Sequence, residues 1–365
     1  MDFLILGKPG YLVLQALVTG LLVGGVYALI ALGIVIINKA SGVFNFAHGF
    51  MMLIGALIFW SLFQSTGLSP VLVFLFSGVV LTVLSTGVRF PANWKREQRI
   101  AVIAVLWGLT GATLIQTDHL LIRALVGTAL GSALMGLVIE RLTIRPLIGQ
   151  PLFTSVMMTL AVGQVLLGAT QLTWGSVERG LPVFATTNAL GLSQAFAPIR
   201  ISGVLGGMLV IKTELLIAFV LAILTFVAFV LFFNYTTLGL SMRATAESQD
   251  LAQAVGLRVR AILAVAWAIA GVLAALAGIL HGASTGISIT MAGLALRAFP
   301  AVLLGGLESI GGAVVGGLVI GVVEKLGTAY FGSDVGEQLM PFVILMIVLI
   351  IRPTGLFGEK RIERI

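Results

Sequence analysis

Long apolar stretches alternate with short polar connections along almost the whole chain. A helix needs about 20 apolar residues to cross a bilayer. Short alternating strands of the barrel type are absent, so the pattern predicts helices and an all-α, polytopic integral membrane protein with about 8–10 transmembrane helices. The expected segments are 11–37, 47–64, 70–88, 100–117, 120–139, 152–174, 213–233 and 262–280, then a glycine-broken block at 294–325 and a last span at 339–352.

Composition supports this class. Of the 365 residues, 59% are hydrophobic and 10% are charged, whereas soluble domains carry about 25% charged residues. The first apolar block is too long for the core of a signal peptide, so we expect a retained span. The chain has no cysteine, which excludes disulfides and thiolate metal sites.

The Lys and Arg residues predict the sidedness. Placing 38–46, 89–99, 140–151, 234–261 and the tail after 352 on one side gives that side 14 of the 21 basic residues. The basic side of a membrane protein is normally cytoplasmic. The N-terminus is then external, and the net charge of +7 reflects membrane orientation rather than binding to nucleic acid.

The block 294–325 requires a different arrangement from the other segments. Only an odd number of crossings fits between the outward-running segment 262–280 and a cytoplasmic tail. We expect a re-entrant pair of half-helices joined between Gly305 and Gly312, with three full spans as the alternative. Irregular backbone at membrane depth is tolerated where it lines a cavity, so Gly305, Gly306, Gly311 and Gly312 are candidate pathway residues.

A second candidate for the pathway precedes the segment 47–64. Asn45 and His48 are polar residues in an apolar and aromatic setting, with Gly49 directly after them. Their spacing of three places both on one face of a helical turn. Two interpretations stay open: a helix break that lines the pathway, or capping of the helix at the interface.

Glycines also recur at spacings of four. The pairs are Gly20 with Gly24, Gly127 with Gly131, Gly312 with Gly316, and Gly317 with Gly321. Such spacing lets another helix approach closely. We expect tight packing within one subunit, with a dimer contact as the alternative.

The polar run at 234–261 carries five charges between Arg243 and Arg260. It predicts a short amphipathic helix of about three turns that ends at Gly256, because glycine is the usual helix C-cap. Its smaller, more apolar face could enter the groove of a partner, and a solvated linker is the alternative. The residues of this segment that we expect to contact a partner protein are Arg243, Ala244, Glu247, Asp250, Leu251 and Gly256.

Enzyme motifs are missing from the sequence. There is no phosphate-binding loop of the Walker type and no zinc-protease motif. The three histidines, His48, His119 and His281, are scattered. We therefore expect no catalytic residues, no metal and no cofactor, and an energy source supplied by another protein.

Four motifs together resemble the permease subunits of branched-chain amino acid ABC importers. They are 24–33 with 45–49, Glu140-Arg141-Leu142 with Arg145-Pro146-Leu147, Leu238 to Gly256, and 298–306 with Arg352 to Gly358. The resemblance implies a single importer transmembrane domain over 1–365, in the bacterial inner membrane. It also implies two cytoplasmic ATPase subunits docked on 234–261, a second, homologous permease subunit as heterodimer partner, and a periplasmic substrate-binding protein.

The chain departs from the family pattern in one region. Three apolar segments occupy 70–139 where the family usually has one span, so we expect an inserted helical hairpin around 89–120. The substrate implied is a branched-chain or other neutral amino acid, with urea or short amides as the alternative. A stand-alone secondary transporter and a membrane scaffold are the competing classes.

Overall fold

The structure is a computed structural model that describes residues 4–5, 7–64, 120–181, 183, 198–307 and 309–358. The predicted segments 70–88 and 100–117, and nearly all of the expected insertion at 89–120, fall outside these residues. Seven of the described helices are long and apolar enough to cross a membrane, and two shorter apolar helices accompany them. The all-α, polytopic fold is confirmed.

The helices follow the predicted segments closely. The long helices are α1 (Gly10–Ser41), α2 (His48–Gln64), α5 (Leu120–Ile139), α6 (Leu152–Trp174), α7 (Thr213–Tyr235), α10 (Val259–Thr285), α11 (Leu294–Gly305), α12 (Ile310–Phe331) and α13 (Met340–Ile351). Shorter helical pieces are α8 (Thr237–Glu247), α9 (Gln249–Ala254), η1 (Glu140–Ile144), η2 (Arg145–Leu147), η3 (Ile289–Gly293) and η4 (Asp334–Leu339). In the described residues the strands form two small antiparallel hairpins, β1 (Leu4–Ile5) with β2 (Lys8–Pro9) and β3 (Ile199–Val204) with β4 (Gly207–Ile211).

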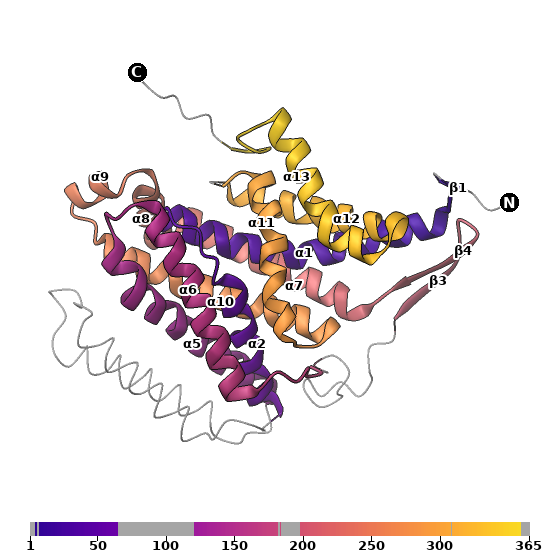
Figure 1. Cartoon of the computed structure of the whole chain (residues 1–365), viewed down its shortest axis with the longest axis horizontal. Coiled ribbons are helices and arrows are strands. Elements are labelled where there is room, and N and C mark those ends of the chain that lie inside the picture. Colours follow the sequence, from indigo (N-terminus) through magenta and orange to yellow (C-terminus); the bar gives the residue numbers. More distant parts are fainter. Residues whose placement is uncertain are drawn as a thin grey trace.

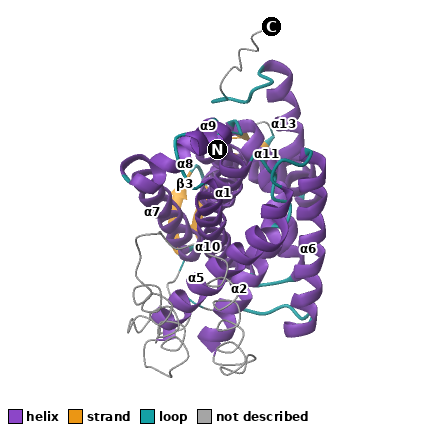
Figure 2. Ribbon diagram, turned by 90° about the vertical axis from the view of Figure 1, so that its left-hand side faces the viewer, coloured by secondary structure: helices purple, strands orange, loops and turns teal. Residues whose placement is uncertain are grey.

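Helix α1 passes through the middle of the molecule. Figure 1 shows the β1–β2 and β3–β4 hairpins at one end of α1 and α8–α9 at the other. Figure 2 looks along α1 and shows other helices around it. Its second half is buried almost without interruption from Gly24 to Ile37. A helix that is apolar on all sides is expected in a buried, central position.

Glycines allow α1 and α12 to pack backbone against backbone. A Cβ atom added to Gly20 would lie 2.7 Å from the carbonyl oxygen of Gly321, and one added to Gly24 would lie 2.8 Å from Cα of Leu318. Gly317 in turn faces Ala28. Because lipid tails are as apolar as the helices, such close van der Waals packing is a main source of helix association in membranes. The predicted packing within one subunit is confirmed for these glycines.

The outer helices expose apolar side chains instead. Examples are Phe153, Val165 and Leu172 on α6, Leu224 on α7 and Ile350 on α13. So many exposed apolar side chains are unfavourable in water. We therefore assign these faces to lipid or to a neighbouring subunit.

The C-terminal block is glycine-broken, as predicted, but its two helices differ in length. Helix α11 has 12 residues, whereas α12 has 22 and is long enough to cross a membrane. The expectation of two half-helices is therefore wrong for α12. The break lies at Gly306, whose φ of 100° favours glycine.

The segment after α13 holds the end of α11. The backbone N–H groups of Leu356 and Phe357 donate to the carbonyl oxygens of Leu304 (2.8 Å) and Gly305 (3.1 Å). These carbonyls belong to the last turn of α11, where helical partners are missing. The tail thereby completes the hydrogen bonding of this helix end.

Candidate translocation pathway

A large cavity opens at the end of the molecule that carries the β3–β4 hairpin. Its volume is about 810 Å³, within the range of small-molecule sites. It lies between the first half of α1 and the last turns of α10 and α12. The Lys and Arg count predicts that this end is external. Its described lining residues include Gln15, Thr19, Tyr27, Lys212, His281, Ser284, Thr290, Arg297, Glu324, Lys325 and Glu337.

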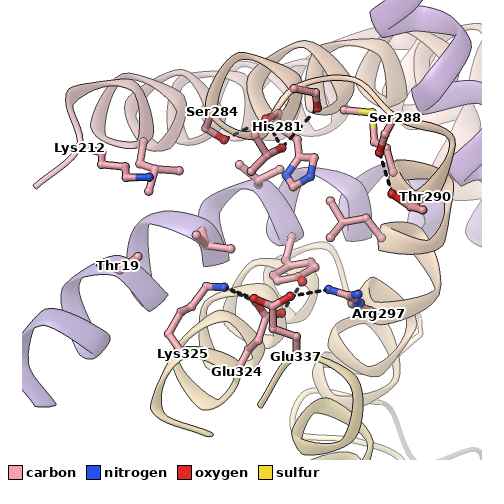
Figure 3. Close-up of a pocket in the computed structure, with 18 of the residues that line it drawn as sticks. Thr19, Lys212, His281, Ser284, Ser288, Thr290, Arg297, Glu324, Lys325 and Glu337 are labelled. Carbon is pink, nitrogen blue, oxygen red and sulfur yellow. Dashed lines mark hydrogen bonds and ion pairs between the residues drawn. The ribbon is translucent and has the colours of Figure 1, made fainter. Parts of the chain in front are cut away.

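One wall of the cavity carries a network of paired charges (Figure 3). Nζ of Lys325 lies 2.8 Å from Glu324 and 3.1 Å from Glu337. Nη1 of Arg297 donates to Glu337 at 3.3 Å. The hydroxyl of Tyr27 donates to the other carboxylate oxygen of Glu324. Charged groups at membrane depth are costly and normally occur paired, and this network satisfies that requirement.

Four elements bring these side chains together. Tyr27 comes from α1, Arg297 from the first turn of α11, Glu324 and Lys325 from α12, and Glu337 from η4. Glu324 is buried, with 2% of its surface exposed, and Arg297 and Glu337 are about one-third exposed. The cluster therefore has a buried, fixed side and a side that faces the cavity.

The opposite wall carries hydroxyl and imidazole groups, together with the charged side chain of Glu178 next to Gly286 after α10. Figure 3 shows His281 and Ser284 from α10 facing the cluster across the cavity, with Ser288 and Thr290 beside them. The hydroxyls of Ser288 and Thr290 lie 2.7 Å apart. Hydroxyl groups both donate and accept hydrogen bonds. This wall can therefore hydrogen-bond to a polar solute in more than one orientation.

The segment before α2 lies deep in the protein. Asn45 and His48 are fully buried. The side-chain oxygen of Asn45 accepts from the backbone N–H of Ala47 at 3.0 Å, which forms an Asx turn directly before α2. His48 packs into the notch left by Gly33 on α1, and Gly49 lies against Ala292 in η3.

The glycines of the C-terminal break have separate roles. Gly305 and Gly312 face each other, so that α11 and α12 touch through their backbones. Gly306 meets Gly358 of the tail, whereas nothing lies within 4 Å of a Cβ added to Gly311. Of the residues predicted to form the pathway, none belongs to the described lining of the external cavity.

The polar segment 234–261, predicted to dock on a partner, forms two helices rather than one. Ser248 adopts an extended conformation between α8 and α9, and its hydroxyl accepts from the N–H of Leu251 as the N-cap of α9. The prediction of a single three-turn helix is therefore wrong. The helical spacing of polar and apolar residues continues through Ser248, but Ser248 ends α8 and caps α9. Gly256, at φ of 86°, follows the end of α9, in the conformation expected of a helix-ending glycine.

The residues predicted to contact a partner protein divide between inward-facing and outward-facing positions. Arg243 donates to the side-chain oxygen of Asn234 at 3.0 Å and lies over the ring of Phe233, so it is bound within the subunit. Ala244, Glu247, Leu251 and Gly256 are exposed. Asp250 lies in the first turn of α9. This end of the molecule thus presents an uncovered helical surface.

A buried ion pair fixes the turn between α5 and α6. Nε and Nη2 of Arg145 donate to the two oxygens of Glu140 at 3.0 and 2.8 Å. Glu140 is fully buried, and its helical turn packs on α10. Such two-pronged pairs are among the strongest polar contacts in proteins. This pair gives Glu140 and Arg145 a structural role at the turn.

The charged cluster was not predicted from the sequence. Arg297, Glu324 and Lys325 lie within the apolar block 294–325, and charges inside apolar helices are a known signal of function. Lys325 pairs with its neighbour Glu324, but the pairs with Glu337 join residues 12 and 40 positions apart, and periodicity within one helix does not predict such pairs.

Long helices around a central helix, a cavity at one end and an exposed helical surface at the other define a polytopic protein of the transport type. Residues 16–351 match the family described as branched-chain amino acid transport system / permease component, and the chain belongs to this family.

Individual relatives agree with this assignment over almost the full length. The chain is 29% identical to the high-affinity branched-chain amino acid transport system permease protein BraD of Pseudomonas aeruginosa, over 97% of this chain and 99% of that protein. It is 26% identical to LivH of Salmonella typhimurium, of the same description, over 96% and 97%. A shorter match is to the autoinducer 2 import system permease protein LsrC of Photorhabdus luminescens. The identity is 36% over 29% of this chain and 30% of that protein. No solved structure matches the chain significantly.

Proposed function

We propose that the chain is the membrane-spanning subunit of an ATP-driven importer in the bacterial inner membrane, and that it passes branched-chain or other neutral amino acids inward. A separate ATPase subunit hydrolyses ATP, an external binding protein delivers the substrate, and a second, homologous permease completes the pathway. Membership of the permease family supports the transport role. The observation that carries the ATP-driven mechanism is the exposed α8–α9 surface at the end opposite the cavity.

The α8–α9 surface has the chemistry of a docking site. Leu240, Leu251 and Val255 are 59%, 68% and 78% exposed in a segment that the charge count places in the cytoplasm. Exposed apolar side chains on an amphipathic helix are the usual anchors for a partner's groove. Caps at both ends of α9 fix the positions of Leu251 and Val255.

The same segment is mechanically joined to the cavity. On its inner side, Met242 and Thr245 of α8 are buried, and α8 packs on α1, α7 and α10. Helix α10 begins at Val259, just after α9, and ends at Thr285 in the cavity wall. Its 27 residues form a rod about 40 Å long. A displacement imposed on α8–α9 would thus reach the cavity through α10.

The docking surface can be tested by substitution. Leu251→Glu and Val255→Glu should each reduce co-purification of the ATPase subunit by about tenfold or more, as loss of an interface anchor does. Val177→Glu is the matched control, because Val177 is 76% exposed and lies near the cavity end. Equal co-purification of all three variants would refute docking at α8–α9.

Transport itself is tested with the purified complex in proteoliposomes. We expect uptake of L-leucine that requires internal ATP and the external binding protein. Uptake driven by a proton gradient without ATP would instead indicate a stand-alone secondary transporter. Uptake of urea or acetamide but not of leucine would assign the complex to the alternative substrate class.

A further inference from the structure

We propose that Arg297 and Glu337 bind the α-carboxylate and α-ammonium groups of a zwitterionic amino acid in the external cavity. Glu324, Lys325 and Tyr27 form the fixed support behind them. This inference rests on the proposed import function and adds the site at which the permease itself recognises its substrate.

The charges of the cavity are balanced. Its described lining holds three basic side chains and three acidic ones, Lys212, Arg297, Lys325, Glu178, Glu324 and Glu337. A solute of net positive or negative charge gains no overall attraction from such a lining. A zwitterion has no net charge but two separated charges, so it is attracted when both meet opposite partners at once.

The pairs within the cluster differ in how easily they can open. Glu324 is buried and is held by both Tyr27 and Lys325, the latter at 2.8 Å. The pair between Arg297 and Glu337 is longer, at 3.3 Å, and both side chains are about one-third exposed. Water and a solute therefore have access to this second pair, and it is the one that a ligand can exchange.

A zwitterion can replace the Arg297–Glu337 contact without leaving either charge unpaired. The planar guanidinium of Arg297 matches a carboxylate with two parallel hydrogen bonds. The carboxylate of Glu337 accepts from an ammonium group while it keeps its contact with Lys325. Urea and amides carry no charges, so they would separate the pair without compensating it.

The rest of the cavity fits an aliphatic side chain. Next to the cluster, the lining includes Val23, Val26, Leu294 and Met291. Burial of apolar groups against such residues is favourable. A charged head at the cluster and an aliphatic tail beside it is the form of a branched-chain amino acid.

The absence of native cysteines allows a direct test of occupancy in the complete permease complex, without the binding protein. Ser284→Cys places one thiol on the wall that faces the cluster, and its labelling rate by a small maleimide reports access to the cavity. We expect saturating L-leucine to slow labelling about threefold or more, as expected when most sites are filled. Ser202→Cys on β3, which is exposed and outside the described cavity lining, should label at an unchanged rate.

The analogues and variants distinguish substrate contact from a structural role. Leucinamide lacks the carboxylate and 4-methyl-2-oxopentanoate lacks the ammonium group, so neither should protect Ser284→Cys. Protection by leucine should be lost in Arg297→Gln and in Glu337→Gln, and kept in Lys212→Gln, which removes a charge from the same cavity. No protection by leucine, equal protection by leucinamide, or protection that persists in Arg297→Gln would each overturn the assignment.

Failure here and failure of the proposed function give different results. If the wild-type complex imports leucine but leucine does not protect the thiol, the zwitterion site is refuted and the import function stands. If the wild-type complex imports no leucine with its binding protein and ATP, the proposed function is refuted.

Discussion

Replacing Gly20 by alanine tests whether contact between backbones holds the centre of the molecule together. The added Cβ would lie 2.7 Å from both the carbonyl oxygen of Gly321 and Cα of Val322. Ordinary contacts of Cβ atoms begin near 3.4 Å, so α1 and α12 would have to separate by about 0.7 Å, since neither backbone can rotate away as a side chain would. Overpacking of this kind lowers the free energy of unfolding by about 1–3 kcal/mol. The higher helix propensity of alanine raises it by up to about 1 kcal/mol.

With the full propensity gain, the expected net effect is a loss of up to about 2 kcal/mol in the free energy of unfolding. It can be measured by titrating the detergent-solubilised protein with sodium dodecyl sulfate and following tryptophan fluorescence. Gly168→Ala is the control, because nothing lies within 4 Å of its added Cβ; only the propensity gain remains, and stability should stay equal or rise. If Gly20→Ala and Gly168→Ala are equally stable, the close-packing argument is wrong.

Other predictions concern single hydrogen bonds. Gln15→Ala removes two bonds to the backbone of Val210, at 2.7 and 2.8 Å, and should raise hydrogen exchange in the β3–β4 hairpin by about tenfold, equivalent to about 1.4 kcal/mol. Ser248→Ala removes the N-cap of α9 and should destabilise that helix by about 1 kcal/mol, seen as faster exchange there but not in α10. Tyr27→Phe removes one partner of buried Glu324 and should lower the free energy of unfolding by about 1–3 kcal/mol, with unchanged stability contradicting the role of this bond.

The extent to which the sequence predicts this fold depends on the range of the interaction. Helices α5 and α6 lie at 120–139 and 152–174, as predicted, because long apolar runs and their boundaries are local properties. The β3–β4 hairpin was not predicted. Its strands have five and six residues, and its backbone is fixed to α1 by Gln15, which lies 195 positions away.

The candidate site shows the same division. Gly256 was predicted because a helix end depends on neighbours within a few residues, whereas for Asn45 both a cap and a break in the pathway stayed open. The pairing of Arg297 with Glu337 depends on how η4 returns beside α11. The break at Ser248 is an intermediate case. Serine is a common helix cap, but the helical spacing of apolar residues on both sides of it favoured one continuous helix.

The attachment of the tail to α11 has a consequence for biogenesis. Leu304 and Gly305 leave the ribosome about fifty residues before Leu356 and Phe357, which donate to their carbonyl oxygens. During synthesis the end of α11 therefore enters the bilayer region with these acceptors unsatisfied, which is unfavourable in hydrocarbon. We expect α11 to reach its final position only after α13 has inserted and the chain is nearly complete. A stop codon just before Leu356 would then leave a permease with every helix made and its last assembly step missing.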